Sequence, residues 1–160
     1  MPEPAVEPGV RRMCMAVAGR PGLLASACRS GGFDRIYVFP APGGGAESAV
    51  APPGIDEVAF AADLVEALRA GVAAGSGPDP GFLALDVGIV HVHEDGFAGS
   101  AIDRVLGIVR GDVLRELARA EQRGLLAAIT EPLFSDLLGE GWPTDGWRFQ
   151  PPVGIWCKRF

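Results

Sequence analysis

Residues 82–110, FLALDVGIVHVHEDGFAGSAIDRVLGIVR, decide how the rest of the chain is interpreted. The first half of this stretch is almost continuously apolar, which is typical of a buried central strand. The Asp95-Gly96 pair then predicts a tight two-residue turn. After the turn, apolar residues recur at helical spacing and predict an amphipathic helix over 98–122, with a break near Gly111. The stretch therefore predicts a strand, a turn and a helix in direct succession.

Outward from this stretch, the same criteria predict further elements on both sides. Strands are expected where apolar, β-branched or aromatic residues run between glycine and proline, at 11–18, 34–39, 125–129, 147–150 and 153–158. Helices are expected over 56–74, with Asp56 as cap, and over 130–138, with the Thr130 hydroxyl as cap. A helical turn is also expected at 23–28. This order predicts an α+β fold, with one sheet and its helices packed on one face.

Length and composition predict a single domain. The chain has 160 residues, of which 48% are hydrophobic, enough to bury a sizeable core. Residues 1–10 contain several prolines and are expected to be a disordered lead, which leaves 11–160 as the domain. Residues 41–54 are rich in Gly and Pro and are expected to be an irregular loop. Lys158 is the only lysine among 14 basic residues, a bias typical of a high-GC genome.

Charge and hydropathy exclude several classes of function. The formal net charge is −6, and the sequence contains no cluster of basic residues to neutralise the phosphates of a nucleic acid. No apolar run reaches the roughly 20 residues that span a bilayer. The N-terminal segment has acidic residues and prolines where a signal peptide needs a basic and then an apolar region. We therefore expect a cytoplasmic protein that binds neither nucleic acid nor membrane.

The cysteines and histidines do not form a recognisable metal motif. Cys14, Cys28 and Cys157 are widely spaced, and none belongs to a C-x-x-C pair. His91 and His93 share one face of the central strand, so they are candidate ligand-binding residues beside Glu94. The alternative is that both histidines are packed or exposed without a ligand. We expect no metal and no cofactor.

The stretch 82–110 resembles the second half of a class III nucleotidyl (adenylate or guanylate) cyclase homology domain. In that family a strand with a His/Gly segment leads through a short turn into a G-x-A-[VI]-N-x-x-x-R-L helix. Residues 99–108, GSAIDRVLGI, match the frame of this helix. The resemblance runs in order over 34–160 and implies a ferredoxin-like, cyclase-like sheet. With the composition, it also suggests an actinobacterial source.

The resemblance places the family's catalytic positions on residues that lack the required chemistry. Its transition-state asparagine falls on Asp103, a carboxylate that would repel a triphosphate, and its arginine falls on Gly107, which offers no cation. The family holds two metal ions with two aspartates, but the first predicted strand contains no acidic residue. The second aspartate is matched to Asp34, which is alternatively an ordinary turn residue. Arg104 and Arg110 are expected to be solvated surface charges.

These observations favour a catalytically inactive cyclase-like domain that acts as a binding, regulatory or protein-interaction module in signalling. The resemblance implies a homodimer or a signalling partner protein, with a nucleotide as a candidate ligand. The expected pairing surface is the sheet face opposite the two long helices, with the 41–54 loop at its rim. One alternative is a divergent enzyme that uses Asp34, Asp103 and the two histidines. Another is an unrelated α+β protein whose match to the family is coincidental.

Overall fold

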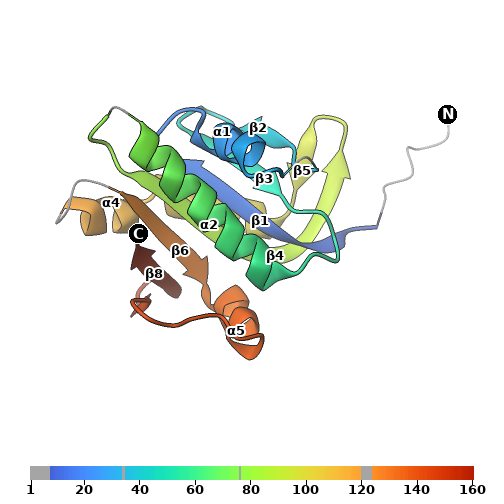
Figure 1. Ribbon diagram of the computed structural model, residues 1–160. Helices are drawn as coiled ribbons and strands as arrows, with labels where there is room; N and C mark the ends of the chain where they lie inside the picture. Colours follow the sequence, from blue (N-terminus) through green and yellow to red (C-terminus); the bar gives the residue numbers. More distant parts are fainter. Residues whose placement is uncertain (1–7, 34, 76, 120–123) are drawn as a thin grey trace.

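The computed structural model describes residues 8–33, 35–75, 77–119 and 124–160, and Figure 1 shows how their helices and strands are arranged. The strands are β1 Val10–Ala18, β2 Val38–Pro40, β3 Ala46–Val50, β4 Gly81–His93, β5 Gly96–Ala98, β6 Leu125–Thr130, β7 Arg148–Gln150 and β8 Ile155–Arg159. The helices are α1 Leu23–Ser30, α2 Glu57–Ala74, α3 Ser100–Arg110, α4 Asp112–Arg119 and α5 Glu131–Gly139. No helix within the described residues is long and apolar enough to cross a membrane.

In the described part of the chain the strands form one eight-stranded sheet, in the order β2-β3-β1-β4-β6-β8-β7. Strand β5 lies off this path and pairs with β4 as a hairpin. Strands β4 and β6 are parallel, joined by the crossover through α3 and α4, whereas the other pairings in the sheet are antiparallel. The central position of β4 explains its nearly continuous apolar sequence, because both of its faces are covered.

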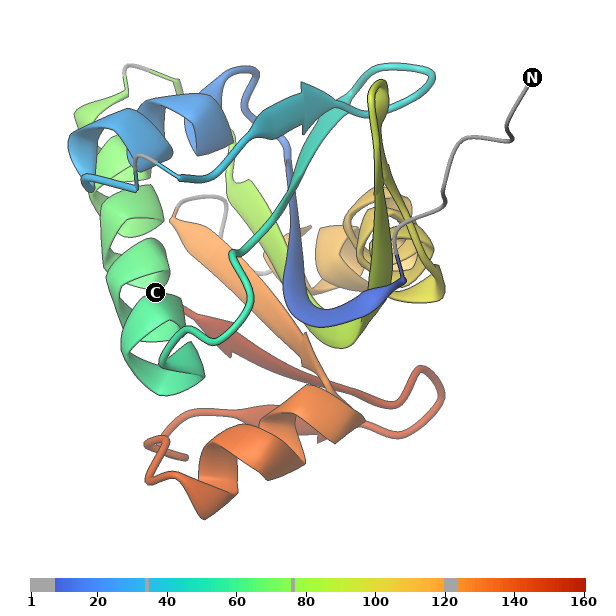
Figure 2. The same cartoon turned by 90° about the vertical axis from the view of Figure 1, so that its right-hand side faces the viewer.

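The helices cover both faces of the sheet, which corrects the expectation of helices on one face. Alternate residues of β1 point to opposite faces, and Met13 and Met15 belong to one buried cluster whereas Cys14 and Ala16 belong to another. The first cluster includes side chains of α1, α2 and α5, and the second includes side chains of α3 and α4. Figure 2 shows α1 and α2 on one side of the sheet and α3 on the other.

Because helices cover both faces in the described part of the chain, the structure shows no bare sheet face that could be the pairing surface expected from the sequence. The two long helices, α2 and α3, lie on opposite sides of the sheet, so neither leaves a bare sheet face behind it. The α+β class itself is confirmed. The start of α2 directly after Asp56 and the break between α3 and α4 at Gly111 are confirmed as well.

Three local predictions are wrong. The segment 41–54 is not an irregular loop throughout, because Ala46–Val50 forms β3 and pairs with β1 from Cys14↔Val50 onward. The strand expected at 34–39 is shorter and later, at Val38–Pro40. The hairpin turn falls at Glu94 and Asp95, since His93 pairs with Gly96.

Gly88 of β4 allows α3 to lie unusually close to the sheet. A Cβ atom at Gly88 would be 2.9 Å from the Cβ of Ala101, the second residue of α3. Contacts of that length do not occur between real side chains, so any larger residue at this position would push the helix away. The small residues on the two elements therefore fix the start of α3 against the centre of the sheet.

Candidate functional site

A buried carboxylate lies at the centre of the sheet, beneath α3. Asp86 of β4 is fully buried, and it is the only fully buried acidic residue in the described part of the chain. Its carboxylate accepts hydrogen bonds from Val87 N at 2.7 Å, from Thr130 Oγ1 at 2.5 Å and from Arg104 Nε at 2.5 Å. A buried charge is tolerated when it is paired and hydrogen-bonded, and Asp86 meets both conditions.

Arg104 and Thr130 have different partners from those predicted. Arg104 was expected to be a solvated surface charge, but it forms an ion pair with Asp86 while half of its side chain remains exposed. Thr130 precedes α5 as expected, but its hydroxyl makes no capping bond and donates to Asp86 instead. The buried carboxylate therefore determines where both side chains point.

A cavity of about 460 Å³ opens beside this ion pair. It lies between α3, the start of α5 and the β7–β8 turn. Its lining includes Arg104, Gly107, Ile108, Thr130, Val153 and Ile155. Among the described residues, Arg104 is the only charged one in the lining, and most of the remaining wall is apolar. The volume falls in the range of small-molecule sites.

The two degenerate positions, Asp103 and Gly107, are both exposed on α3, one helical turn apart. A Cβ added at Gly107 would meet no atom within 4 Å, so nothing in the fold requires glycine there. Gly107 lines the cavity, whereas Asp103 does not. The structure thus brings Gly107, Arg104 and Thr130 to one cavity.

The two histidines lie together in the β4–β5 hairpin, away from this cavity. His91 pairs with Ala98 and is half-buried, whereas His93 pairs with Gly96 and is exposed. The Nδ1 atom of His91 is buried and has no hydrogen-bond partner within the described residues. No group of three His, Cys, Asp or Glu side chains that could hold a metal ion occurs in that part of the chain.

A second hairpin follows β1 and α1 in the chain. It is formed by β2 and β3, and its turn spans 41–45, APGGG, which contains no carboxylate. Asp34, the predicted surviving acid, precedes β2 and lies outside the described residues. Arg110 donates to the carbonyl oxygens of Pro42 and Gly44 at 2.6 and 2.9 Å, so it holds this turn and is not merely solvated.

Glu47 is the carboxylate nearest to this turn in the sequence, and both of its oxygens already accept hydrogen bonds from backbone amides. Its two carboxylate oxygens accept hydrogen bonds from Leu24 N at 3.2 Å and Ala25 N at 3.4 Å. These amides lie in the first turn of α1, whose N-terminal end favours negative charge. Glu47 therefore takes the place that a bound anion would occupy at the start of α1.

The described residues do not fit the two metal ions that the resemblance implies. Strand β1 carries no acidic residue and the β2–β3 turn carries none. Asp86 is neutralised by Arg104 beneath the helix, and Glu47 is bound by backbone amides. Divalent cations such as Mg²⁺ need accessible carboxylate oxygens, which these side chains do not provide.

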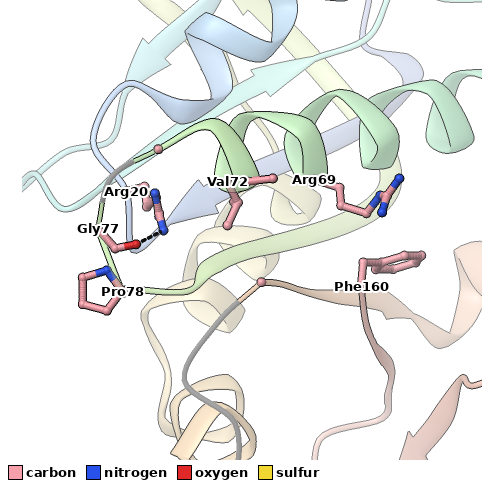
Figure 3. Close-up of a pocket in the computed structure, with 9 residues that line it drawn as sticks. Arg20, Arg69, Val72, Gly77, Pro78 and Phe160 are labelled. Atoms are coloured by element: carbon pink, nitrogen blue, oxygen red, sulfur yellow. Dashed lines mark hydrogen bonds between the residues drawn. The ribbon is translucent and has the colours of Figure 1, made fainter.

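A second cavity, of about 550 Å³, lies at the C-terminal end of α2 and is shown in Figure 3. Arg20 and Arg69 both contribute to its lining. Arg20 donates to the carbonyl oxygens of Asp79 and Gly77, each at 2.7 Å, and Arg69 is paired with Glu66 on the surface. Both arginines therefore have partners within the chain, and Arg20 fixes the connection between α2 and β4.

The three cysteines are free and buried. Burial, together with the neighbouring Asp86, raises the pKa of the Cys14 thiol to about 12. Burial also raises the pKa of Cys157 to about 12 and, together with Glu47, that of Cys28 to about 11. These thiols therefore stay protonated at neutral pH and are poor nucleophiles or metal ligands.

Solved structures share this arrangement of strands and helices. The adenylate/guanylate cyclase/hydrolase from Silicibacter pomeroyi superimposes with a TM-score of 0.51 at 10% identity, covering 92% of this chain and 96% of that one. The monomeric guanylyl cyclase domain of the RhoGC fusion protein from the aquatic fungus Blastocladiella emersonii gives 0.55 at 8% identity, covering 96% of both chains. No protein-family model and no curated protein matches the chain. The fold is therefore that of a class III nucleotidyl cyclase domain, as the sequence predicted.

Sequence reasoning singled out α3 and Gly107, and it named Arg104 and Thr130 in other roles, but it missed Asp86 and Glu47. Asp86 stands within an apolar strand, and a lone acid in such a run is a signal that a buried partner exists. The partner itself was not predictable, because Arg104 follows 18 residues later on a different element. Glu47 was missed because its strand was assigned to a loop.

Proposed function

We propose that this chain is a catalytically silent nucleotidyl cyclase-like domain that acts as a binding or regulatory module in cytoplasmic signalling. The observation that carries the proposal is the exposed face of α3. There, Asp103 and Gly107 present a carboxylate and bare backbone where a cyclase of this fold is expected to carry an asparagine and an arginine. A negative charge at this place opposes a triphosphate, and no side chain at Gly107 can stabilise charge on a phosphoryl group.

The start of α1 supports the same proposal. Phosphate groups bind well at helix N-termini, because the first backbone amides point outward and the helix dipole favours negative charge. In this chain the amides of Leu24 and Ala25 are bonded to Glu47. A nucleotide that placed a phosphate there would first have to displace a carboxylate held by the protein.

A turnover assay tests this proposal. Purified protein is incubated with ATP or GTP and Mn²⁺, and we expect no cyclic product above a heat-killed control. The variant Asp103→Asn/Gly107→Arg restores the two side chains of α3, and the open space at Gly107 accommodates the arginine. We expect this variant to be inactive as well, because β1 and the β2–β3 turn still lack carboxylates.

Cyclic product from the wild-type chain that is abolished by Asp34→Ala would instead favour the divergent enzyme. Product from the double variant alone would mean that a usable metal site is present. A nucleotide is the candidate ligand of the silent module, and thermal shift with ATP, GTP and their cyclic products tests it, since a ligand of the folded state raises the melting temperature.

A further inference from the structure

We propose that the cavity beside Arg104 is a binding site for a small organic anion, a carboxylate carried on an apolar body. The inference deepens the binding role proposed above and rests on it, but the cavity can be tested without any measurement of turnover. It depends on the polarity of the Asp86–Arg104 ion pair, on the free donors of Arg104 and on the character of the cavity wall.

The ion pair is oriented so that its positive member faces the cavity. Asp86 is fully buried beneath α3 and does not line the cavity, whereas Arg104 lines it and is 51% exposed. The carboxylate therefore lies behind two residues of the cavity lining, Arg104 and Thr130, which both donate hydrogen bonds to it. An anion in the cavity would meet the cation at close range and the buried carboxylate at a greater distance, so attraction would outweigh repulsion.

Arg104 also keeps hydrogen-bond donors for a ligand. Its Nε donates to Asp86, and within the described residues its terminal nitrogens have no partner. A guanidinium presents five N–H donors in a planar fork that matches the two oxygens of a carboxylate. The bond to Asp86 fixes the orientation of this fork before any ligand arrives, which lowers the entropy cost of binding.

The rest of the cavity selects for an apolar body. Ile108, Val153 and Ile155 contribute apolar side chains to the wall, and no charged residue other than Arg104 lines it in the part of the chain that the structure describes. A fully hydrated inorganic ion would leave this apolar surface uncovered, whereas an aromatic or branched aliphatic carboxylate would bury it. Gly107 keeps the α3 side of the cavity open, because it has no side chain to occupy the space.

The test is a titration with benzoate, followed by ¹H–¹⁵N correlation spectra of the whole chain. Gly107 and Gly154 both line the cavity, so their amide signals are expected to move, while that of Gly32 is expected to stay. Benzamide has the same shape without the charge and is the matched ligand control. We expect benzoate to bind at least about five-fold more tightly than benzamide, which corresponds to about 1 kcal/mol of charge interaction.

Variants that retain the Asp86–Arg104 pair avoid a folding defect. Val153 is 45% exposed, so Val153→Asp places a negative charge at the cavity with little structural cost, and Val153→Asn is its neutral control. We expect Val153→Asp to bind benzoate about five-fold or more weakly than Val153→Asn does, and the two variants to bind benzamide equally. Gly107→Leu is expected to abolish binding of both ligands by filling the space.

Equal affinity for benzoate and benzamide would overturn the assignment, as would benzoate binding that neither Val153→Asp nor Gly107→Leu weakens. The absence of any shift at Gly107 and Gly154 at millimolar benzoate would also overturn it. None of these results would bear on the absence of cyclase turnover, which the nucleotide assay measures separately.

Discussion

At the scale of single residues, the stability of the chain depends on how Asp86 is neutralised. Removal of Arg104 leaves a buried carboxylate with two neutral donors and no counter-charge. Breaking a buried ion pair from one side costs about 3–5 kcal/mol, and the half-exposed Arg104 places this pair toward the low end. We therefore expect Arg104→Leu to lower the free energy of unfolding, measured by urea denaturation, by about 3 kcal/mol.

Arg115→Leu is the matched control, because Arg115 is exposed on α4 and its replacement is expected to change stability by less than about 0.5 kcal/mol. The double variant Asp86→Leu/Arg104→Leu removes both charges. It is expected to recover part of the loss, because it leaves no unpaired charge in the interior. If Arg104→Leu lowered the free energy of unfolding no more than Arg115→Leu does, the ion pair would not contribute to stability.

Replacement by alanine is predicted to have opposite effects on stability at two glycines, Gly107 within α3 and Gly88 on β4 beneath it. A methyl group at Gly107 meets nothing and replaces the poorer helix former, so Gly107→Ala should stabilise the chain by up to about 1 kcal/mol. At Gly88 the methyl group would lie 2.9 Å from the Cβ of Ala101, so Gly88→Ala should destabilise it by about 1–3 kcal/mol. Thermal and urea unfolding of the two variants measure both signs. A stabilising Gly88→Ala would mean that the distance between α3 and β4 is wider than described.

At the scale of elements, helix α3 also holds the β2–β3 hairpin in place. Arg110, in the last turn of α3, bonds to two carbonyl oxygens of the hairpin turn. We expect Arg110→Ala to speed amide hydrogen exchange at residues 43–46 several-fold, because the turn loses its anchor. The cost in global stability should be about 1 kcal/mol or less, since these bonds are exposed. Faster exchange throughout the sheet, or the same local effect in Arg115→Ala, would contradict this role.

The elements that could be predicted from the sequence are those whose signal is local. Helix α2 has Asp56 as its cap, which accepts a hydrogen bond from Ala59 N at 3.0 Å, and its apolar stripe made it predictable. Strand β3 has no such signal: AESAV is short and lies between glycine- and proline-rich segments. It is a strand because β1 lies beside it, and pairing with a distant segment cannot be inferred from composition.

The covering of both sheet faces was missed for a related reason. Periodicity shows which side of a helix is apolar, but not which face of the sheet it packs on. The alternation in MCMAVA of β1 contains the answer, since both sets of side chains are apolar and both are buried. A strand that is apolar on both faces predicts helices on both sides.

At the scale of the whole molecule, the remaining question is whether the domain acts alone. Apolar side chains remain exposed at several places on its surface, among them Tyr37 at 69% and Ile89 at 54%. Aromatic side chains such as that of Tyr37 are enriched at the cores of protein–protein interfaces. We propose that the chain forms a homodimer or binds a signalling partner protein, through a surface other than a bare sheet face.

Light scattering over a wide range of protein concentration tests the homodimer. We expect the weight-average mass to rise from one chain toward two chains, because a reversible dimer is favoured by mass action. The variant Tyr37→Ser is the first to compare, since Tyr37 is the most exposed large hydrophobic side chain among the described residues. An exposed residue contributes little to the stability of the monomer. A change in dimerisation caused by Tyr37→Ser would therefore come from the interface and not from unfolding. A constant monomer mass at the highest concentration would exclude the homodimer and leave only a partner protein. A pull-down from the native lysate that recovers no specific protein would then contradict the interaction role altogether.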